Sequence, residues 1–260
     1  MKIDWKPALS LVMLLMMGTG TSWASAPGHG KSAAGGNAHW GYEGREGPDN
    51  WGRLSSAYEL CGKGHNQSPV NIVKPAPHEL DSLDMSYDNY SLKIVNNGHT
   101  IQVNVPDGKL HIAGETYDLL QYHFHTPSEH RVDGDHAPME VHFVHKSAEG
   151  RLAVVGVMMR KGRFNTALDR IWRNMPSKAG ETVVMDKLEV SPFELMPKSR
   201  DYYHYNGSLT TPPCSEGVRW FVLADGIEVA AAQIERFKQV VGENSRPTQP
   251  LHERHVRVTK

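Results

Sequence analysis

Three histidines have the residue type and the spacing needed to bind a metal ion. His123 and His125 are separated by one residue, and His142 follows in a second strand-like run. Because side chains on a strand alternate between its two faces, His123 and His125 share one face. A neighbouring strand would then bring the third imidazole beside them. Three protein ligands with a fourth position left open are typical of a catalytic zinc site.

Gln121 and Glu140 each precede one of these histidines by two residues and share its strand face. A carbonyl or carboxylate in that position can accept the imidazole N–H that does not bind the metal, which fixes the tautomer of the ligand. We therefore expect Gln121 to orient His123 and Glu140 to orient His142. One zinc ion per chain is the predicted cofactor.

The elements that must position these histidines are predicted to be strands. Residues 119–125 and 139–145 carry the histidines, and 152–159 is an almost continuous apolar run, as expected for a central strand buried on both faces. Further short strands bounded by turn sequences are expected at 91–96, 100–105 and 109–112. Helices are expected at 166–175 and 231–241. The predicted fold is mostly β: a single domain built on a large twisted, mainly antiparallel central sheet with a few short peripheral helices.

The chain has 260 residues, of which 39% are hydrophobic, and a formal net charge of −1. This balance gives no indication of nucleic-acid binding, for which a basic face is expected. Residues 1–24 are typical of a secretory signal peptide, with an apolar run too short to span a bilayer. An uncleaved anchor is the alternative. Residues 25–38 are predicted to be a flexible linker and 39–260 the folded domain. We expect a periplasmic or secreted protein that has no membrane contact after cleavage.

Export also affects the interpretation of the two cysteines. In an exported protein, Cys61 and Cys214 are expected to form one disulfide, and two separate buried thiols are the alternative. The disulfide would close a loop of about 150 residues, for which the chain-entropy model gives a stabilisation of about 5 kcal/mol.

A second segment, residues 205–214, reads Tyr-Asn-Gly-Ser-Leu-Thr-Thr-Pro-Pro-Cys and is expected to form a rigid, proline-bounded loop. Beside the histidine cluster, this segment makes the chain resemble the α-class carbonic anhydrases of the bacterial exported type. The motifs that carry the resemblance occur in order at residues 39–42, 67–72 and 97–99, at the three histidines, and at 207–214 and 244–250. Together they cover nearly all of residues 39–257.

The resemblance implies a zinc-dependent, reversible hydration of carbon dioxide to bicarbonate and a proton, by attack of zinc-bound hydroxide on CO₂. Thr210 would accept a hydrogen bond from the hydroxide and donate its own proton to Glu129, since a carboxylate can only accept. Thr211 would contact bicarbonate. Weak ester hydrolysis is the expected side activity. In the family the apolar recess for CO₂ is lined by the residues that correspond here to Val144, Val154, Leu209 and Trp220.

His99 occupies the family's proton-shuttle position, where imidazole is suitable because it titrates near neutral pH. A solvated turn histidine is the alternative. Tyr42 and Gln102 match positions that order the connecting waters, although many members of the family have Asn where this chain has Gln102. The bacterial exported members also pair cysteines at positions like Cys61 and Cys214. The expected partners are CO₂ and bicarbonate, and the chain is expected to be a monomer or homodimer.

Two other classes of function compete with this interpretation. His123 and His125 followed by Glu129 match the cupin spacing, in which the Glu is also a metal ligand. The glycines that a cupin requires are replaced here by Tyr117 and His136. The second competitor is a non-catalytic binding module on the same fold, which typically lacks one metal-binding histidine. The sequence gives no role to the other histidines of the domain, among them His65, His130, His145 and His252, which by default lie at the surface or form hydrogen bonds.

Overall fold

A computed structural model describes residues 38–260. The predicted signal peptide, and the predicted linker except Ala38, lie outside the described residues. The helices of the described part are α1 (Trp51–Leu54), α2 (Leu60–Lys63), α3 (Thr166–Arg173) and α4 (Ala231–Val241). Its strands are β1 (Asn71–Ile72), β2 (Ala76–His78), β3 (Asp84–Ser86), β4 (Tyr90–Asn96), β5 (Ile101–Asn104), β6 (Lys109–Ile112), β7 (Glu115–His125), β8 (Arg131–Val132), β9 (Asp135–His136), β10 (Met139–Ser147), β11 (Leu152–Lys161), β12 (Thr182–Val190), β13 (Tyr202–Ser208), β14 (Glu216–Leu223), β15 (Ile227–Val229) and β16 (Arg257–Thr259).

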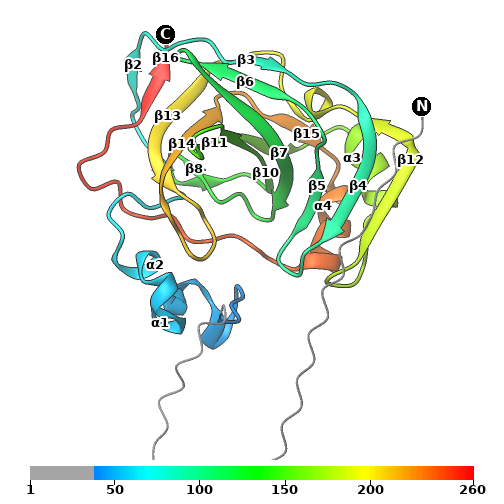
Figure 1. The fold of residues 1–260 in the computed structure, drawn as a ribbon, viewed down its shortest axis with the longest axis horizontal. Coiled ribbons are helices and arrows are strands. Elements are labelled where there is room, and N and C mark those ends of the chain that lie inside the picture. The colour runs from blue at the N-terminus through cyan, green and yellow to red at the C-terminus, as the bar shows by residue number, and fades with distance from the viewer. Residues whose placement is uncertain (1–37) are drawn as a thin grey trace, which may run out of the picture. The chain divides into compact units, whose positions relative to one another are not determined.

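Thirteen of these strands form one mixed sheet, in the order β12-β4-β5-β7-β10-β11-β14-β13-β16-β2, with β3, β6 and β15 attached beside this path (Figure 1). Most neighbours are antiparallel, while β11 pairs in parallel with β14 and β15, and β16 with β2. A separate small sheet contains β1, β8 and β9. The predicted fold class, mostly β with a mainly antiparallel sheet and few helices, is confirmed. Among residues 38–260, no helix is both long and apolar enough to cross a membrane.

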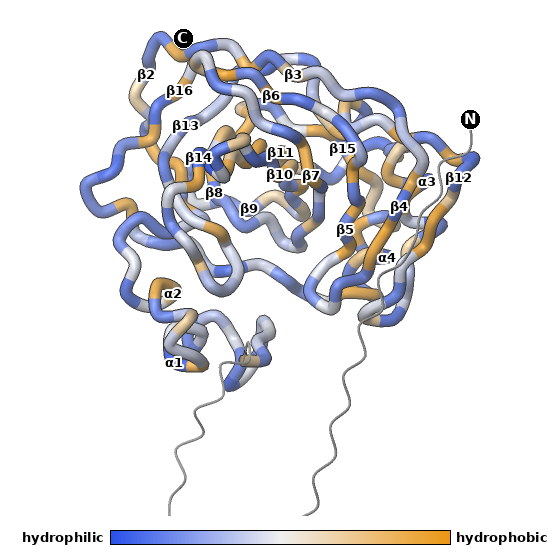
Figure 2. Tube along the Cα trace, in the orientation of Figure 1, coloured by the Kyte–Doolittle hydropathy of each residue, from blue (hydrophilic) through white to orange (hydrophobic). Residues whose placement is uncertain are grey.

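The central strands β7, β10 and β11 carry much of the apolar sequence (Figure 2). In β11, the residues from Ala153 to Met159 are all buried, as predicted for a strand covered on both faces. Helices α3 and α4 cover part of the core, and the rings of Trp172 and Phe237 stack between them with centroids 5.3 Å apart. Because such a core fixes the strands laterally, it also fixes the positions of side chains on their other face.

The main elements predicted from the sequence are present. Helix α4 has the predicted bounds, and Gly242 follows it with a φ of 81°, a left-handed conformation that favours glycine. Strand β7 begins at Glu115, earlier than the predicted residue 119. The prediction of a loop from residue 205 was partly wrong, because residues 205–208 belong to β13. Strand β12 was not predicted. Most of its side chains are exposed, so apolar and polar residues do not alternate along it.

The predicted disulfide between Cys61 and Cys214 is confirmed, with an S–S distance of 2.11 Å across 153 positions of sequence. It lies in a small hydrophobic cluster with Trp51 and Tyr58. Helices α1 and α2 approach so closely there that a Cβ on Gly52 would lie 2.7 Å from the backbone nitrogen of Gly62. The disulfide therefore joins these two helices to the turn that follows β13.

Candidate metal centre and active site

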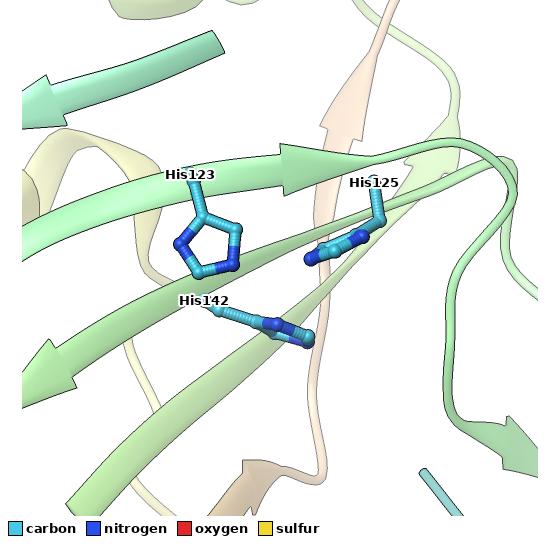
Figure 3. A group of neighbouring side chains, drawn as sticks. All are labelled: His123, His125 and His142. Carbon is cyan, nitrogen blue, oxygen red and sulfur yellow. The ribbon is translucent and has the colours of Figure 1, made fainter. Parts of the chain in front are cut away.

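The three predicted metal ligands come together from two adjacent strands. In the antiparallel pairing of β7 and β10, His142 lies directly opposite His123, and His125 follows on the same face of β7. The ring centroids are 5.0 Å apart for His123 and His125, 5.4 Å for His123 and His142, and 4.5 Å for His125 and His142. Figure 3 shows the three rings converging. One nitrogen from each ring can be chosen so that all three lie within 4.8 Å of one another.

In each ring, one nitrogen contacts a neighbouring oxygen and the other is left for the metal ion. Gln121 Oε1 lies 2.9 Å from His123 Nδ1, and the backbone carbonyl oxygen of Asn244 lies 2.7 Å from His125 Nδ1. Glu140 Oε1 lies 2.9 Å from His142 Nε2, although the two groups are not aligned as a hydrogen bond. Asn244 belongs to a motif noted in the sequence but had no predicted role, because a backbone carbonyl leaves no signal in the residue types.

These residues fit a zinc ion. His125 Nε2 is buried and has no hydrogen-bond partner in the protein. A buried polar atom without a partner costs free energy, and a bound metal ion would remove that cost. Burial lowers the pKa of all three imidazoles, to about 4 for His125, so each is neutral at pH 7 and has a lone pair to donate. Neutral imidazole is a preferred ligand of zinc. The predicted zinc site is therefore confirmed: the three histidines form a set of donors that suits one zinc ion.

A second group of possible ligands, His130, Glu140 and His142, serves instead as support for the first. Both ring nitrogens of His130 are engaged, Nδ1 with Glu140 Oε1 at 2.8 Å and Nε2 with the Tyr205 hydroxyl at 2.7 Å. Glu140 Oε2 accepts the backbone N–H groups of Glu129 and His130, both at 2.9 Å. Burial acts to raise the pKa of Glu140, but His130 and His142 outweigh it and hold the pKa well below its usual range. A buried carboxylate is thus held ionised behind His142.

Gly156 creates the space for that carboxylate. It lies opposite His142 in the pairing of β10 with β11, and a Cβ at this position would lie 2.9 Å from Glu140 Oε1. The signal in the sequence was a glycine inside the apolar run of residues 152–159, since glycine in a strand often marks a close approach. No role was predicted for this glycine.

Glu129 is buried beside the three histidines. Its Oε1 accepts the backbone N–H of Arg246 at 2.9 Å, while Oε2 has no hydrogen-bond partner and lies 3.6 Å from His125 Nε2. Burial raises the pKa of Glu129 to about 7, against the opposing effects of His142 and the Thr210 hydroxyl. Thr210 is thus close to Glu129 but makes no aligned hydrogen bond with it, so the bond expected between them stays a prediction.

The four residues expected to form an apolar recess lie in one cluster next to the histidines. Val144 pairs with Val154 across β10 and β11, and Val154 pairs with Trp220 across β11 and β14. The ring of Trp220 lies 4.9 Å from that of His142, measured between centroids. Leu209 packs on the same cluster. A patch of apolar surface therefore adjoins the metal centre.

A cavity of about 160 Å³ lies beside the histidines. Its lining includes five residues expected at the site in addition to His123 and His125: Tyr42, His99, Gln102, Gln121 and Thr211. Gln102 lies opposite His123 in the pairing of β5 with β7, and its amide donates to Asn104 Oδ1 at 2.7 Å. His99 also lines an outer cavity of about 510 Å³, so this ring lies between the inner cavity and the outer one.

Arg246 is a supporting residue that lies in the motif at residues 244–250 and had no predicted role. Its side chain is 1% exposed. The guanidinium donates to Gln67 Oε1 and to the carbonyl oxygens of Ser68 and Cys61, at 2.9, 2.8 and 2.8 Å. Burial lowers its pKa to about 10. Since its backbone N–H holds Glu129, Arg246 connects the metal centre to the disulfide region.

A large mixed sheet that holds three neutral imidazoles at a common point beside a small cavity is the arrangement of a catalytic zinc centre. A profile of the eukaryotic-type carbonic anhydrases matches residues 46–260. The chain belongs to this family, the α-class carbonic anhydrases, and has its activity, the hydration of CO₂. The family assignment also removes the cupin interpretation.

Individual relatives agree with the profile. The chain is 43% identical over 253 residues to a carbonic anhydrase of Neisseria gonorrhoeae, and the aligned region covers 96% of each sequence. It is 44% identical over 220 residues to a carbonic anhydrase of Pectobacterium carotovorum, covering 84% of this chain and 90% of the relative. The solved α-carbonic anhydrase of Thermovibrio ammonificans, in complex with sulfanilamide, superposes with a TM-score of 0.83 at 44% identity, covering 86% of this chain and 100% of that one.

Proposed function

We propose that this protein hydrates CO₂ reversibly outside the cytoplasm and exports the proton through His99. The observation that carries the proposal is that His99 lines both the inner cavity, which contains His123 and His125, and the outer cavity. A group between the two can take a proton from one side and release it on the other. When bound, zinc lowers the pKa of water to about 7 and so supplies the nucleophile at neutral pH.

Thr210 and Glu129 would orient the nucleophile. Glu129 Oε2 is directed at the metal centre, 3.6 Å from His125 Nε2 and 3.8 Å from His142 Nδ1, and has no hydrogen-bond partner. An ionised carboxylate can only accept, so a hydrogen bond from the Thr210 hydroxyl would leave the threonine oxygen free to accept one from the nucleophile. The lone pair of the nucleophile is then directed at the substrate.

The substrate would lie on the apolar cluster beside His142. CO₂ carries no charge and gains by leaving water for the surface made by Val144, Val154, Leu209 and Trp220. Bicarbonate is charged and needs polar contacts, for which the Thr211 side of the inner cavity is suitable. This difference favours release of the product from the recess that receives the substrate.

The proton would leave along waters ordered by Tyr42 and Gln102, which line the inner cavity with His99. Imidazole exchanges protons readily because its pKa lies near the working pH. Burial lowers the pKa of His99 below its usual value, and His39 adds to this effect. A lower pKa makes release of the proton from His99 to external buffer easier.

The Cys61–Cys214 disulfide supports export, since disulfides persist in oxidising compartments. We propose that residues 1–24 are a cleaved signal peptide, that 25–38 link it to the domain of residues 39–260, and that the mature protein is periplasmic or secreted, as a monomer or homodimer. Weak hydrolysis of activated esters would be a side activity of the same site.

A stopped-flow assay of CO₂ hydration tests the proposal, with zinc-loaded protein in a weakly buffered indicator solution. We expect saturable hydration that requires the metal, and none above the buffer rate after its removal. The His123→Ala variant is the matched control, because it removes one ligand at the cavity wall without touching the apolar cluster. A zinc-loaded protein no faster than this variant would exclude the enzymatic function.

A further inference from the structure

Two histidines outside the metal centre lie beside one another on the surface. The ring centroids of His65 and His252 are 5.2 Å apart and the ring planes are inclined by 54°, although the residues are 187 positions apart (252 − 65). This separation falls within the range of 4.5 to 5.4 Å found between the rings of the zinc-binding histidines. Both side chains are exposed. Two imidazoles at this distance can bind one ion together.

The backbone on each side of this pair is held in place. Next to His65, the Asn66 N–H donates to Glu216 Oε1 at 2.7 Å, and the Gly64 N–H donates to the Leu60 carbonyl oxygen at 2.9 Å. The disulfide at Cys61 fixes the same segment. Because the segment is ordered before any ligand arrives, binding would cost less conformational entropy.

The segment around His252 is ordered by Arg254. Its guanidinium donates to the carbonyl oxygens of Pro250 and Asn206, at 2.7 and 3.0 Å, and its backbone N–H donates to the Leu251 carbonyl oxygen at 3.0 Å. The arginine is thus engaged with backbone oxygens. His252 itself has a φ of 51°, in the left-handed region, which is an uncommon backbone conformation for a residue other than glycine.

In the described part of the chain, neither ring of the pair forms a hydrogen bond with a protein group. Other histidines differ: His111 lies 2.9 Å from Thr116 Oγ1, and His204 lies 2.9 Å from the Trp220 carbonyl oxygen. The nitrogens of His65 and His252 are therefore available to an external ligand. Imidazole is a suitable ligand for Zn²⁺, Cu²⁺ and Ni²⁺.

We propose that His65 and His252 form a second, peripheral site for a divalent transition-metal ion, which binds the two imidazoles and completes its coordination with water. The site is independent of the catalytic one and shares no residue with it. A bound ion would cross-link the segment after α2 to the segment before β16. Since both ligands are in place only in the folded chain, the ion would stabilise the folded state by an amount that grows with the logarithm of its concentration.

Calorimetric titration of Zn²⁺ into the full, zinc-loaded chain tests this site. We expect one equivalent of zinc beyond the catalytic one. In His65→Ala and in His252→Ala, its affinity should fall by about tenfold or more, because each ligand raises the effective concentration of the other. The double variant should bind more weakly than either single variant, but its loss of binding free energy should be smaller than the sum of the two single losses, which is the signature of two groups that bind one ion together. His78→Ala is the matched control, since it removes an exposed histidine elsewhere, and it should bind as the parent does.

Two further measurements separate loss of the peripheral site from misfolding of the variants. CO₂ hydration should be unchanged in the His65→Ala and His252→Ala variants, which shows that they fold and retain the catalytic zinc. Electron paramagnetic resonance of one added equivalent of Cu²⁺ should report two nitrogen ligands in the parent and one in each single variant. Zinc affinity that is equal in the parent and the double variant would overturn the proposal, as would an equal loss in His78→Ala.

Discussion

The imidazole of His99 lies flat against the indole of Trp40, with the ring centroids 3.7 Å apart and the ring planes 7° from parallel. Trp40 in turn packs edge-on against Trp51 and Tyr42, at centroid distances of 5.2 and 5.7 Å. The indole is therefore anchored, and it covers one face of the His99 ring. Because burial is the main cause of the lowered His99 pKa, we expect the covering indole of Trp40 to contribute to this shift.

Replacing Trp40 with Ala should raise the His99 pKa toward about 6.5, the ordinary value for histidine. The change removes the covering ring, so water can better solvate the charged imidazolium. A titration followed by ¹H–¹⁵N NMR of the histidine side chains measures this directly. Trp40→Phe keeps a flat partner and should give a smaller rise. An unchanged His99 pKa in Trp40→Ala would show that Trp40 does not contribute to the shift.

Replacing His99 with Ala should lower the maximal turnover of CO₂ in weak buffer by about 10²-fold, the lower end of what acid–base groups contribute. The ratio of turnover to KM should change much less, because proton export follows the chemical step. Added imidazole buffer should restore part of the rate. If turnover in weak buffer stays at the parent level, His99 has no part in proton transfer.

Replacing Glu129 with Gln should leave one zinc ion per chain but strongly lower turnover. Gln keeps an oxygen for the Arg246 N–H, while its amide can donate and no longer forces the Thr210 hydroxyl into one direction. Zinc content and stopped-flow rates measure the two effects. Glu140→Gln is the contrasting variant: it weakens the contact with His142, and zinc affinity should fall by about 10- to 100-fold. Loss of zinc from Glu129→Gln would instead make Glu129 a ligand.

His145 should make stability depend on pH. It is fully buried, with Nε2 at 2.7 Å from the Tyr87 hydroxyl, and burial lowers its pKa to about 4. The unfolded chain, with an ordinary pKa of about 6.5, therefore binds a proton first, and stability falls as pH drops from about 6.5 to about 4. The 2.5-unit difference corresponds to about 3 kcal/mol.

Urea unfolding of the parent and of His145→Gln, measured from pH 7 to pH 4, checks this contribution. The metal ligands also titrate in acid, but they do so in both proteins, so their effect cancels in the difference. The stability advantage of the parent should shrink by about 3 kcal/mol as the pH falls. A difference that is independent of pH would mean that His145 is not held neutral by the fold.

Removing the disulfide should lower the free energy of unfolding by about 2–5 kcal/mol. The double variant Cys61→Ala with Cys214→Ala is the test, because it removes the cross-link without leaving a free thiol. Denaturant unfolding at constant zinc concentration gives the value. Chemical reduction of the parent should reproduce it, and a double variant as stable as the oxidised parent would contradict the prediction.

The metal centre could be predicted from the sequence because its ligands lie close together along the chain. The period of two along a strand is enough to place His123 and His125 together, and Gln121 beside them. The apolar run at residues 152–159 likewise indicated a central strand, because burial on both faces leaves a continuous pattern.

The rest depends on contacts between distant segments. The Asn244 carbonyl reaches His125 across 119 positions, and the Arg246 N–H reaches Glu129 across 117. Both are backbone groups that every residue carries, so no pattern of side chains reveals them. His130 was left without a role for a related reason, since its partner Tyr205 lies 75 positions away on β13.

The disulfide makes the attachment of one active-site turn depend on the redox state of the surroundings. Cys214 ends the turn that carries Thr210 and Thr211, and its N–H donates to the Thr211 carbonyl oxygen at 2.8 Å. A newly made chain in a reducing cytoplasm would lack the covalent bond that holds this turn to α2. The turn that carries the two threonines would therefore gain its covalent tether only in an oxidising environment.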